Sequence, residues 1–138
     1  MDKIFIDTNI LIYANDKKSL FYNDSILALS DLSRNNDFVI STQTIREYAK
    51  FVTVTSTYEN AIKGIKLIRN QFEILYEDSD VFNIWIMLIE QYKIIGKLVF
   101  DCNIVATMLA NNVKKILTNN PKDFKIYENE IEIVPLVN

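Results

Sequence analysis

Residues 3–14 have the sequence KIFIDTNILIYA, and this stretch decides the fold. Residues 4–6 form a β-branched and aromatic run without a polar interruption, which is typical of a short strand covered on both faces. Asp7 follows the run directly, and apolar spacing after it predicts a helix from about Ile10. Open α/β sheets bind ligands beyond the carboxyl ends of their strands. Asp7 is therefore either a helix cap or part of a ligand site, and the stretch alone leaves both open.

Strand-like runs and helical patterns alternate along the rest of the chain. Further strands are predicted over residues 38–42, 72–76, 114–118 and 130–135. The last is expected at a sheet edge because it stops at Pro135. Apolar residues at helical spacing predict helices over about 20–32, 43–53, 57–70, 81–93 and 101–109. This alternation predicts a three-layer α/β/α sandwich around a central, mainly parallel sheet of four to five strands, in one domain over residues 1–138.

Two local expectations concern helices that carry acidic residues. Residues 96–100 are expected to form a loop that leads to Asp101 at a helix N-terminus. Because Asp101 precedes the apolar Ile104 by three residues, it continues the inward face of its helix and is aimed at the sheet. On the helix over 43–53, Ile45, Ala49 and Val52 are expected to form the apolar face, with Glu47 on an adjacent or opposite arc.

The composition excludes several kinds of chemistry. The chain has no His, which removes His-based triads, His general bases and His-ligated zinc sites. Its two glycines, Gly64 and Gly96, are too far apart for a G-x-G-x-x-G loop or a P-loop. The single Cys102 cannot form an internal disulfide, and we interpret it as a core residue in a reducing cytoplasm. An enzyme with this composition would use carboxylates, amides, hydroxyls, lysines and a metal ion.

Charge and hydropathy narrow the range of partners. The net charge of −3 argues against binding nucleic acid by bulk charge, but not against binding phosphate through divalent cations. Lys63, Lys66 and Arg69 recur at three-residue spacing, which indicates a solvated helix face, with an RNA contact as the alternative. No apolar run approaches the roughly 20 residues that span a bilayer, and the N-terminus does not have the pattern of a signal peptide.

Acidic side chains are expected to gather at one edge of the sheet. Asp7, Asp123 and the 118–120 loop follow predicted strand ends, and Glu47 and Asp101 lie on helices that begin at that edge. The carboxyl ends of parallel strands lie together, so these carboxylates are predicted to converge. Carboxylates without His or Cys form a hard oxygen site that suits Mg²⁺ or Mn²⁺. Such sites hydrolyse phosphodiesters with a metal-activated water.

Three segments of the chain together resemble the PIN-domain family, with a size and pattern similar to the VapC-type ribonuclease toxins. They are residues 5–14, FIDTNILIYA, residues 40–47, ISTQTIRE, and residues 117–124, LTNNPKDF. The resemblance covers essentially the whole chain. It implies a metal-dependent endoribonuclease that cuts RNA, a homodimer, and an antitoxin that inhibits the toxin by inserting a segment near its active site.

The resemblance also implies roles for single residues. Asp7 and Asp101 would hold one divalent ion, Mg²⁺ or Mn²⁺. Glu47 and Asp123 would orient or deprotonate the attacking water, or hold a second ion. The residues expected to support the carboxylates or to contact phosphate are Thr8, Asn9, Thr118 and Asn120. Apart from the resemblance, we expect Lys97 and Lys122 to meet the RNA backbone, because they lie near the predicted site.

This chain departs from the family pattern at two places. Some relatives have an acid directly after the Thr of the third segment, where this chain has Asn119 and Asn120. We assign the fourth acidic place to Asp123, with Asn120 as a hydrogen-bonding substitute. Many relatives also have a small or polar residue before the helix aspartate, where this chain has Phe100.

Two other functions remain open from the sequence. A phosphatase of the haloacid dehalogenase type also begins with an apolar strand and an Asp, but it requires a second Asp where this chain has Asn9. A catalytically silent PIN-like module that binds RNA or a protein is the other alternative, and the Asn119–Asn120 pair favours it. The dimer surface is expected either on the helix around residues 58–68 or on the helix that carries Trp85.

Overall fold

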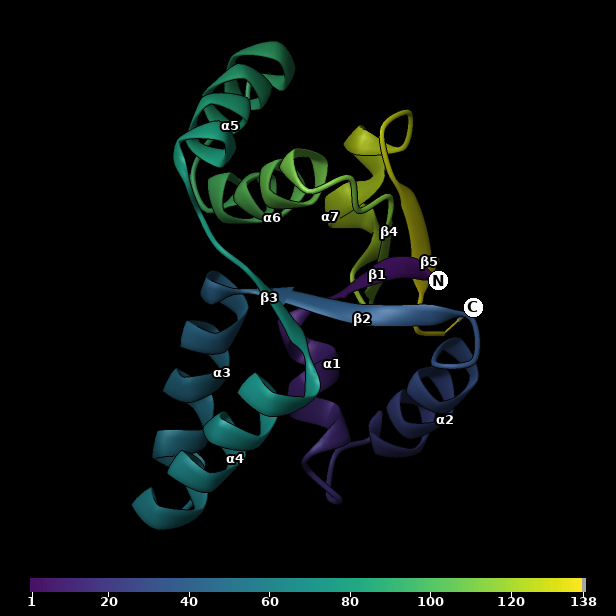
Figure 1. Cartoon of the computed structure of the whole chain (residues 1–138), viewed down its shortest axis with the longest axis vertical. Helices are drawn as coiled ribbons and strands as arrows, with labels where there is room; N and C mark the ends of the chain where they lie inside the picture. The colour runs from purple at the N-terminus through teal and green to yellow at the C-terminus, as the bar shows by residue number, and fades with distance from the viewer. Residues whose placement is uncertain (138) are drawn as a thin grey trace.

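A five-stranded sheet forms the middle layer of the molecule (Figure 1). The computed structural model describes residues 1–137. The sheet has the order β3-β2-β1-β4-β5, and its paired strands all run parallel. The strands are β1 (Asp2–Ile6), β2 (Asn36–Ser41), β3 (Glu73–Leu75), β4 (Lys115–Thr118) and β5 (Glu132–Pro135). The predicted parallel sheet is confirmed, with β1 at its centre and β5 at an edge.

Helices cover both faces of the sheet, which confirms the predicted three layers (Figure 1). On one face lie α1 (Thr8–Ala14), α2 (Tyr22–Leu32), α3 (Thr42–Thr55) and α4 (Tyr58–Gln71). On the other lie α5 (Ser79–Tyr92), α6 (Leu98–Ala110), the short α7 (Pro121–Phe124) and a 3-10 turn, Lys125–Tyr127. Successive side chains of β1 point to opposite faces of the sheet and so enter two different cores. Phe5 packs with the α5–α6 side, while Ile4 and Ile6 pack with the α1–α3 side.

The strand order creates a switch point between β1 and β4. The chain builds β2 and β3 on one side of β1 and then crosses over to place β4 and β5 on the other. The two strand ends are held together where the backbone N–H of Asp7 donates to the carbonyl of Leu117, at 3.0 Å. Ligands of open α/β sheets bind at such a point, so the fold itself indicates where a site should lie.

The start of α6 differs from the prediction, because residues 98–100 are helical and not part of a loop. Gly96 turns the chain with a φ of 60°, and the N–H of Val99 donates back to the Gly96 carbonyl at 3.2 Å. The Trp85 indole N–H donates to the Val99 carbonyl at 2.8 Å and fixes this turn against α5. Asp101 therefore completes the first helical turn and does not begin the helix.

The buried face of α3 also differs from the prediction, because it is formed by Thr44, Tyr48 and Val52. Ile45 and Ala49 are only partly buried. Thr44 can be buried because its backbone N–H donates to the Ser41 hydroxyl, and its own hydroxyl accepts from the Ser41 N–H, in a capping box. With this face of α3 buried, Glu47 lies next to the buried residue Tyr48 and is itself exposed, near the carboxyl edge of the sheet.

Other expectations about burial are confirmed. Cys102 is a free, fully buried core residue, and Val81 and Leu88 of α5 pack in the same core. Lys63, Lys66 and Arg69 on α4 are exposed, as expected of a solvated face. Within residues 1–137, no helix combines the length and the apolar content needed to cross a membrane.

Candidate active site

Asp7 is both a helix cap and the centre of the polar edge. It lies between β1 and α1 and is only 8% exposed. One carboxylate oxygen, Oδ1, accepts from the backbone N–H of Thr8 at 2.9 Å. The other, Oδ2, accepts from the hydroxyl of Thr118 at 2.7 Å, across the switch point from β4. Because each oxygen has further lone pairs, these bonds fix the direction of the carboxylate without using its whole capacity to accept.

The charges around Asp7 work against its ionisation. Burial raises the pKa of Asp7, and the hydrogen bonds from Thr118 and Thr8 oppose that rise. The negative charges of Glu47 and Asp123 add to the rise in pKa. Asp7 is thus a buried carboxylate with two neutral donors and two acidic neighbours, an arrangement that a bound cation would stabilise.

Asp101 faces the same group of charges from α6. The pKa of Asp101 is raised from its ordinary value of 3.8 to about 6, mainly by burial and then by the negative charges of Asp7, Asp123 and Glu47, while Lys97 lowers it. Each of these three acids therefore lies close enough to act on Asp101. The four carboxylates that the sequence singled out therefore lie in one group, with Asp7 from the β1–α1 junction and the others from α3, α6 and α7.

Glu47 is held by two hydrogen bonds at the exposed side of the cluster. Its Oε1 accepts from the Thr8 hydroxyl at 3.4 Å and from the Gln43 amide at 3.2 Å. Gln43 also donates to the Phe100 carbonyl at 3.2 Å, and its Oε1 accepts from the Asn103 amide at 2.9 Å. Gln43 and Asn103 are site residues that were not predicted from the sequence. The four-residue spacing of Gln43 and Glu47 on one helix is the signal that could have found the first.

The loop after β4 supports the site through its backbone. The N–H of Asn120 donates to the Thr118 hydroxyl at 3.0 Å, so this hydroxyl lies between Asn120 and Asp7. The Asn119 amide donates to the Tyr13 hydroxyl at 3.4 Å. Asp123 is exposed on α7, and it is the residue of this loop whose charge acts on Asp7 and Asp101.

The remaining predicted residues lie in different surroundings. Asn9 is half-buried in the first turn of α1, next to Thr8. Lys97 lies just before α6 and acts electrostatically on Asp101. Lys122 is exposed on α7 and lines a separate shallow hollow with Lys125 and Ile133.

The side chains present fit a divalent cation that keeps part of its water shell. In the described part of the chain, none of the four carboxylates forms a salt bridge with a Lys or Arg. The described residues also contain no group of three or more Cys, Asp or Glu side chains that is already arranged to hold a metal ion. Mg²⁺ is commonly held by one or two carboxylates and several waters. The all-oxygen set centred on Asp7 and Asp101 suits that mode of binding.

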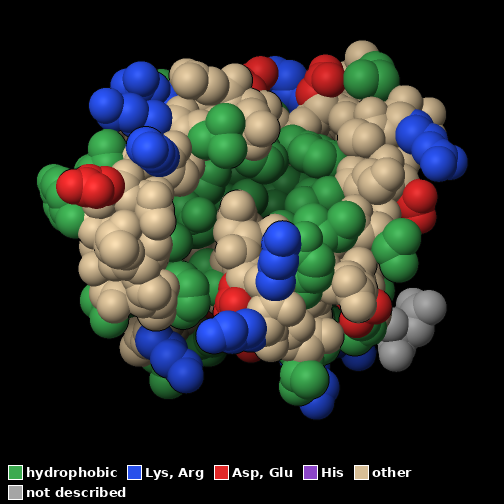
Figure 2. Space-filling view, turned by 90° about the horizontal axis from the view of Figure 1, so that it is seen from below, with side chains coloured by type: hydrophobic (Ala, Val, Ile, Leu, Met, Phe, Trp, Pro, Cys, Tyr) green, Lys and Arg blue, Asp and Glu red, His purple; other side chains and the backbone are tan. Residues whose placement is uncertain are grey.

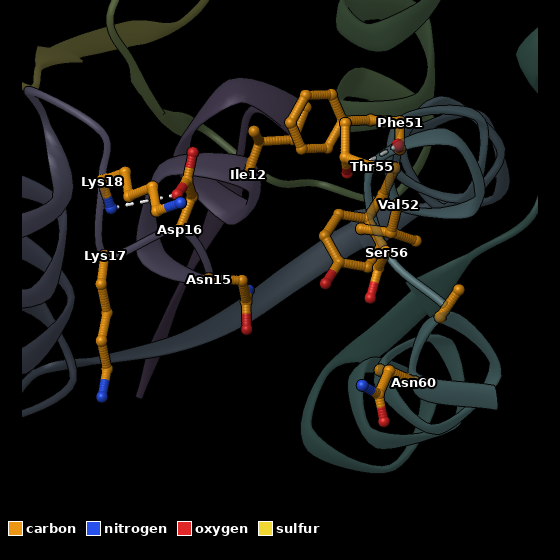
Figure 3. A pocket seen from close by; sticks show the side chains of 13 residues that line it. Ile12, Asn15, Asp16, Lys17, Lys18, Phe51, Val52, Thr55, Ser56 and Asn60 are labelled. Carbon is orange, nitrogen blue, oxygen red and sulfur yellow. Dashed lines mark hydrogen bonds between the residues drawn. The ribbon is translucent and has the colours of Figure 1, made fainter. Parts of the chain in front are cut away.

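A large hollow opens on the α1–α4 side of the molecule. Figure 2 shows it from below, with a floor of hydrophobic side chains. A pocket of about 590 Å³ lies there between the α1–α2 loop and the α3–α4 pair. Figure 3 shows Asp16, Lys17 and Lys18 on one side of it, and Phe51 and Asn60 on the other. The two helices approach closely at this pocket, since a Cβ on Gly64 would lie 3.4 Å from the Tyr48 hydroxyl.

Comparisons with known proteins place this geometry in a family. The family model of the PIN domain matches residues 4–129. Solved structures with the same fold include VapBC2 from Rickettsia felis, bound to a DNA fragment from its promoter, with 24% identity and a TM-score of 0.73 over 96% of this chain and 97% of that one. VapBC-1 from nontypeable Haemophilus influenzae has 23% identity and a TM-score of 0.76 over 98% of both chains.

A third structure is that of a toxin with a stated target. Mycobacterium tuberculosis VapC20, a toxin that cleaves the sarcin-ricin loop, has 12% identity and a TM-score of 0.63 over 83% of this chain and 87% of that one. At these identities the structural likeness establishes the shared fold. A search of curated protein sequences gives no significant match.

Proposed function

This chain belongs to the PIN domain family, and we propose that it is a divalent-metal-dependent endoribonuclease, the toxin of a type II toxin–antitoxin pair. The observation that carries the proposal is that Asp7, Glu47, Asp101 and Asp123 gather around the switch point. Neighbouring carboxylates there raise the pKa of Asp7 and that of Asp101, and none of the four has a paired cation among the described residues. Its likeness to VapBC toxin structures supports the same class of function. The proposal places the protein in the cytoplasm, together with its RNA substrate.

In this proposal Asp7 and Asp101 hold the cation, Mg²⁺ or Mn²⁺. The bound ion would neutralise the scissile phosphate and lower the pKa of an attacking water. The protein's own part is to fix the ligands: Thr8 and Thr118 hold the two oxygens of Asp7 in one orientation. Because both donors are neutral, they do not compete with the cation for the charge of Asp7.

Glu47 is placed to accept the proton of the attacking water. It is the exposed member of the hydrogen-bonded set, and its Oε1 is oriented by Thr8 and Gln43. No hydrogen bond among residues 1–137 uses its Oε2, which can accept one from water. Asp123 approaches from α7 and completes the acidic surface around the water. Asn9 follows Thr8 in α1, and Asn120 donates its backbone N–H to the Thr118 hydroxyl. In this proposal both would contact phosphate oxygens.

Cleavage of total RNA tests the proposal. The wild-type protein and the Asp7→Asn variant would be incubated with RNA in Mg²⁺, in Mn²⁺ and with a chelator. Discrete fragments are expected from the wild type only, and they should disappear with the chelator. Asp2→Asn is the matched control, because Asp2 is an exposed carboxylate at the opposite end of the same strand and should leave cleavage unchanged.

Other outcomes would favour the alternative functions. Folded protein that binds a divalent ion but never cuts RNA would indicate a silent PIN-like module, which is the function that the Asn119–Asn120 pair favours. A phosphoenzyme trapped on Asp7 would indicate a phosphatase. Equal cleavage by wild type and Asp7→Asn would contradict the assignment of the site.

The proposed partner is an antitoxin whose inhibitory segment occupies the hollow between α1 and the α3–α4 pair. The apolar floor suits hydrophobic side chains of such a segment, and Lys17 and Lys18 on the rim suit acidic ones (Figure 3). The small protein encoded beside this gene would be co-expressed and co-purified. Phe51→Asp should abolish the complex, whereas Lys63→Asp on the solvated face of α4 should keep it. A complex that survives Phe51→Asp would exclude this site.

We also propose that the protein is a homodimer. Light scattering should then give a mass of about twice the 16.1 kDa of one chain. A mass equal to one chain over the micromolar range would contradict this part of the proposal.

A further inference from the structure

A second pocket adjoins the acidic cluster on its α5–α6 side. It has a volume of about 440 Å³ and lies between α3, the loop before α5, α5 itself and the first turn of α6. This volume falls in the range of small-ligand sites. The side chains that define its chemistry are Gln43, Arg46, Phe82, Trp85, Phe100 and Asn103.

The pocket and the acidic cluster share a wall. Gln43 lines the pocket, while its amide donates to Glu47 of the cluster. Phe100 also lines the pocket, and the next residue along α6 is Asp101. A polymer whose phosphate lies at the carboxylates would therefore bring its neighbouring unit to this pocket.

One side of the pocket is aromatic and open to solvent. Phe82 is 57% exposed and Phe100 is 62% exposed, although both are large apolar side chains. The rings of Phe82 and Trp85 lie 5.9 Å apart at 37°. The indole is fixed because its N–H donates to the Val99 carbonyl. Flat, partly exposed rings held in place are typical of surfaces on which unpaired nucleic-acid bases stack.

The other side of the pocket is a fixed network of polar groups. The Asn103 side-chain amide N–H group donates to Gln43 at 2.9 Å and to Glu77 at 3.1 Å. Within residues 1–137 its side-chain oxygen accepts no hydrogen bond and can accept one from a ligand. Arg46 is held by Glu77 at 3.3 Å, with its side chain 66% exposed. The pocket thus offers an aromatic surface, an oriented acceptor and an accessible guanidinium.

We propose that this pocket binds one unpaired nucleobase of the RNA, adjacent to the phosphate that is cut. The base stacks on the aromatic side, its hydrogen-bonding edge faces Asn103, and Arg46 contacts a neighbouring phosphate. This proposal rests on the ribonuclease function proposed above. The enzyme would then distinguish one RNA sequence from another at this pocket.

A second copy of the chain is the competing occupant. Ile86 and Met87 continue the exposed apolar surface of α5, and such a surface could be covered by another protein. The polar network favours the nucleobase. An apolar contact between two copies would bury the side-chain oxygen of Asn103 and the Arg46 guanidinium without new hydrogen-bond partners, which costs free energy.

Intrinsic fluorescence tests the proposal directly, since Trp85 is the only tryptophan of the chain. The full-length Asp7→Asn variant, with a chelator present, would be titrated with ten-residue single-stranded homo-oligomers of A, G, C and U. An oligomer of abasic ribose phosphate serves as the control ligand. We expect saturable quenching of Trp85 by at least one base-containing oligomer, and none by the abasic one.

Variants locate the binding. Phe100→Ala and Asn103→Ala should each weaken the binding roughly 10-fold, in keeping with the loss of one stacked or hydrogen-bonded base. Tyr58→Ala is the matched control, because Tyr58 is also a highly exposed aromatic residue but lies on α4. Far-ultraviolet circular dichroism would show that the variants remain folded.

Three results would overturn the proposal: no quenching by any oligomer, quenching unchanged by Phe100→Ala, or Trp85 emission that follows protein concentration and ignores RNA. The last would indicate a contact between two copies. The test is independent of cleavage. Normal RNA cleavage without quenching would remove this pocket and keep the ribonuclease, whereas base-dependent quenching without any cleavage would keep the pocket and remove the ribonuclease.

Discussion

The two edges of the same parallel sheet carry opposite arrangements of charge. At the amino edge, two ion pairs of opposite charge form: Lys3 Nζ lies 3.0 Å from the Glu73 carboxylate, and Lys115 Nζ lies 3.6 Å from the Asp2 carboxylate. At the carboxyl edge, four acidic side chains meet, and in the described chain none of them has a basic partner within salt-bridge distance. There the pKa of Asp7 and that of Asp101 are raised.

This difference separates stability from binding within one sheet. Exposed ion pairs contribute little to stability, but they leave no charge unbalanced. A buried carboxylate among other carboxylates destabilises the fold until a cation neutralises it. We therefore expect the carboxyl edge to lower the stability of the metal-free protein and to bind a cation, and the amino edge to do neither.

The largest expected effect is on catalysis. Asp101→Asn should lower the rate of RNA cleavage by about 100-fold or more, because it removes a proposed cation ligand where even supporting residues are worth 10–100-fold. Initial rates would be measured on an RNA that the wild type is found to cut. Glu73→Gln at the amino edge is the control and should leave the rate unchanged. A rate in Asp101→Asn within a few-fold of the wild type would contradict the assignment.

The next effect is on the pH dependence of stability. The pKa of Asp101 rises from an ordinary 3.8 to about 6 on folding, mainly through burial and then through Asp7, Asp123 and Glu47. Its contribution to stability is therefore full below pH 3.8 and is lost as the pH rises through about 6. Since Asp101 is only partly buried, we expect a loss of about 1–2 kcal/mol after solvent screening.

Thermal unfolding of the metal-free protein from pH 4 to pH 7.5 would measure this loss. Asp101→Asn should flatten the profile and raise the unfolding temperature at pH 7.5, and Mg²⁺ should do the same for the wild type. An Asp101→Asn variant that is less stable than the wild type at pH 7.5 would show that the ionised carboxylate of Asp101 does not destabilise the fold.

A smaller effect is expected from a neutral donor. Thr118→Val removes the hydroxyl that Asp7 accepts from, which should raise the pKa of Asp7 further and weaken Mg²⁺ binding about 10-fold. Thr107→Val is the matched control, because Thr107 is equally buried but bonds to the Asn103 carbonyl inside α6. Isothermal titration would compare the two, and equal affinities would exclude a supporting role for Thr118.

The smallest effect is expected at the amino edge. Lys3→Met breaks the exposed pair with Glu73 and should cost about 0–1 kcal/mol, with no change in cleavage. Urea unfolding and the cleavage assay would be run on the same preparation. A change in cleavage rate would mean that the two edges are not independent.

The layers and the acidic edge could be predicted because they depend on local patterns. The run Ile4–Phe5–Ile6 alternates between two cores, and Asp7 must follow it at the strand end. The start of α6 could not be predicted, because it depends on the bond from the Trp85 indole, fourteen residues away, to the Val99 carbonyl. Asn103 could not be predicted for a similar reason, since it meets Gln43 only when α3 and α6 pack at the sheet edge. The bond from Gln43 to Glu47, in contrast, is local to α3.

The arrangement of the strands could be predicted only in part. The alternation of strands and helices predicts a parallel sheet, but not that β1 and β4 are neighbours. That pairing brings the Thr118 hydroxyl to Asp7 across 111 residues of sequence. The supporting contacts of the site are thus set by tertiary structure, while its acidic residues are visible in the sequence.

Binding of Mn²⁺ at pH 7.5 tests the central claim most directly. Isothermal titration calorimetry would compare the wild type with Asp7→Asn and Asp2→Asn, which remove one carboxylate from each edge of the sheet. We expect a saturable site in the wild type and in Asp2→Asn, and its loss in Asp7→Asn. Saturable binding that is the same in all three proteins, or no binding in the folded wild type, would contradict that claim.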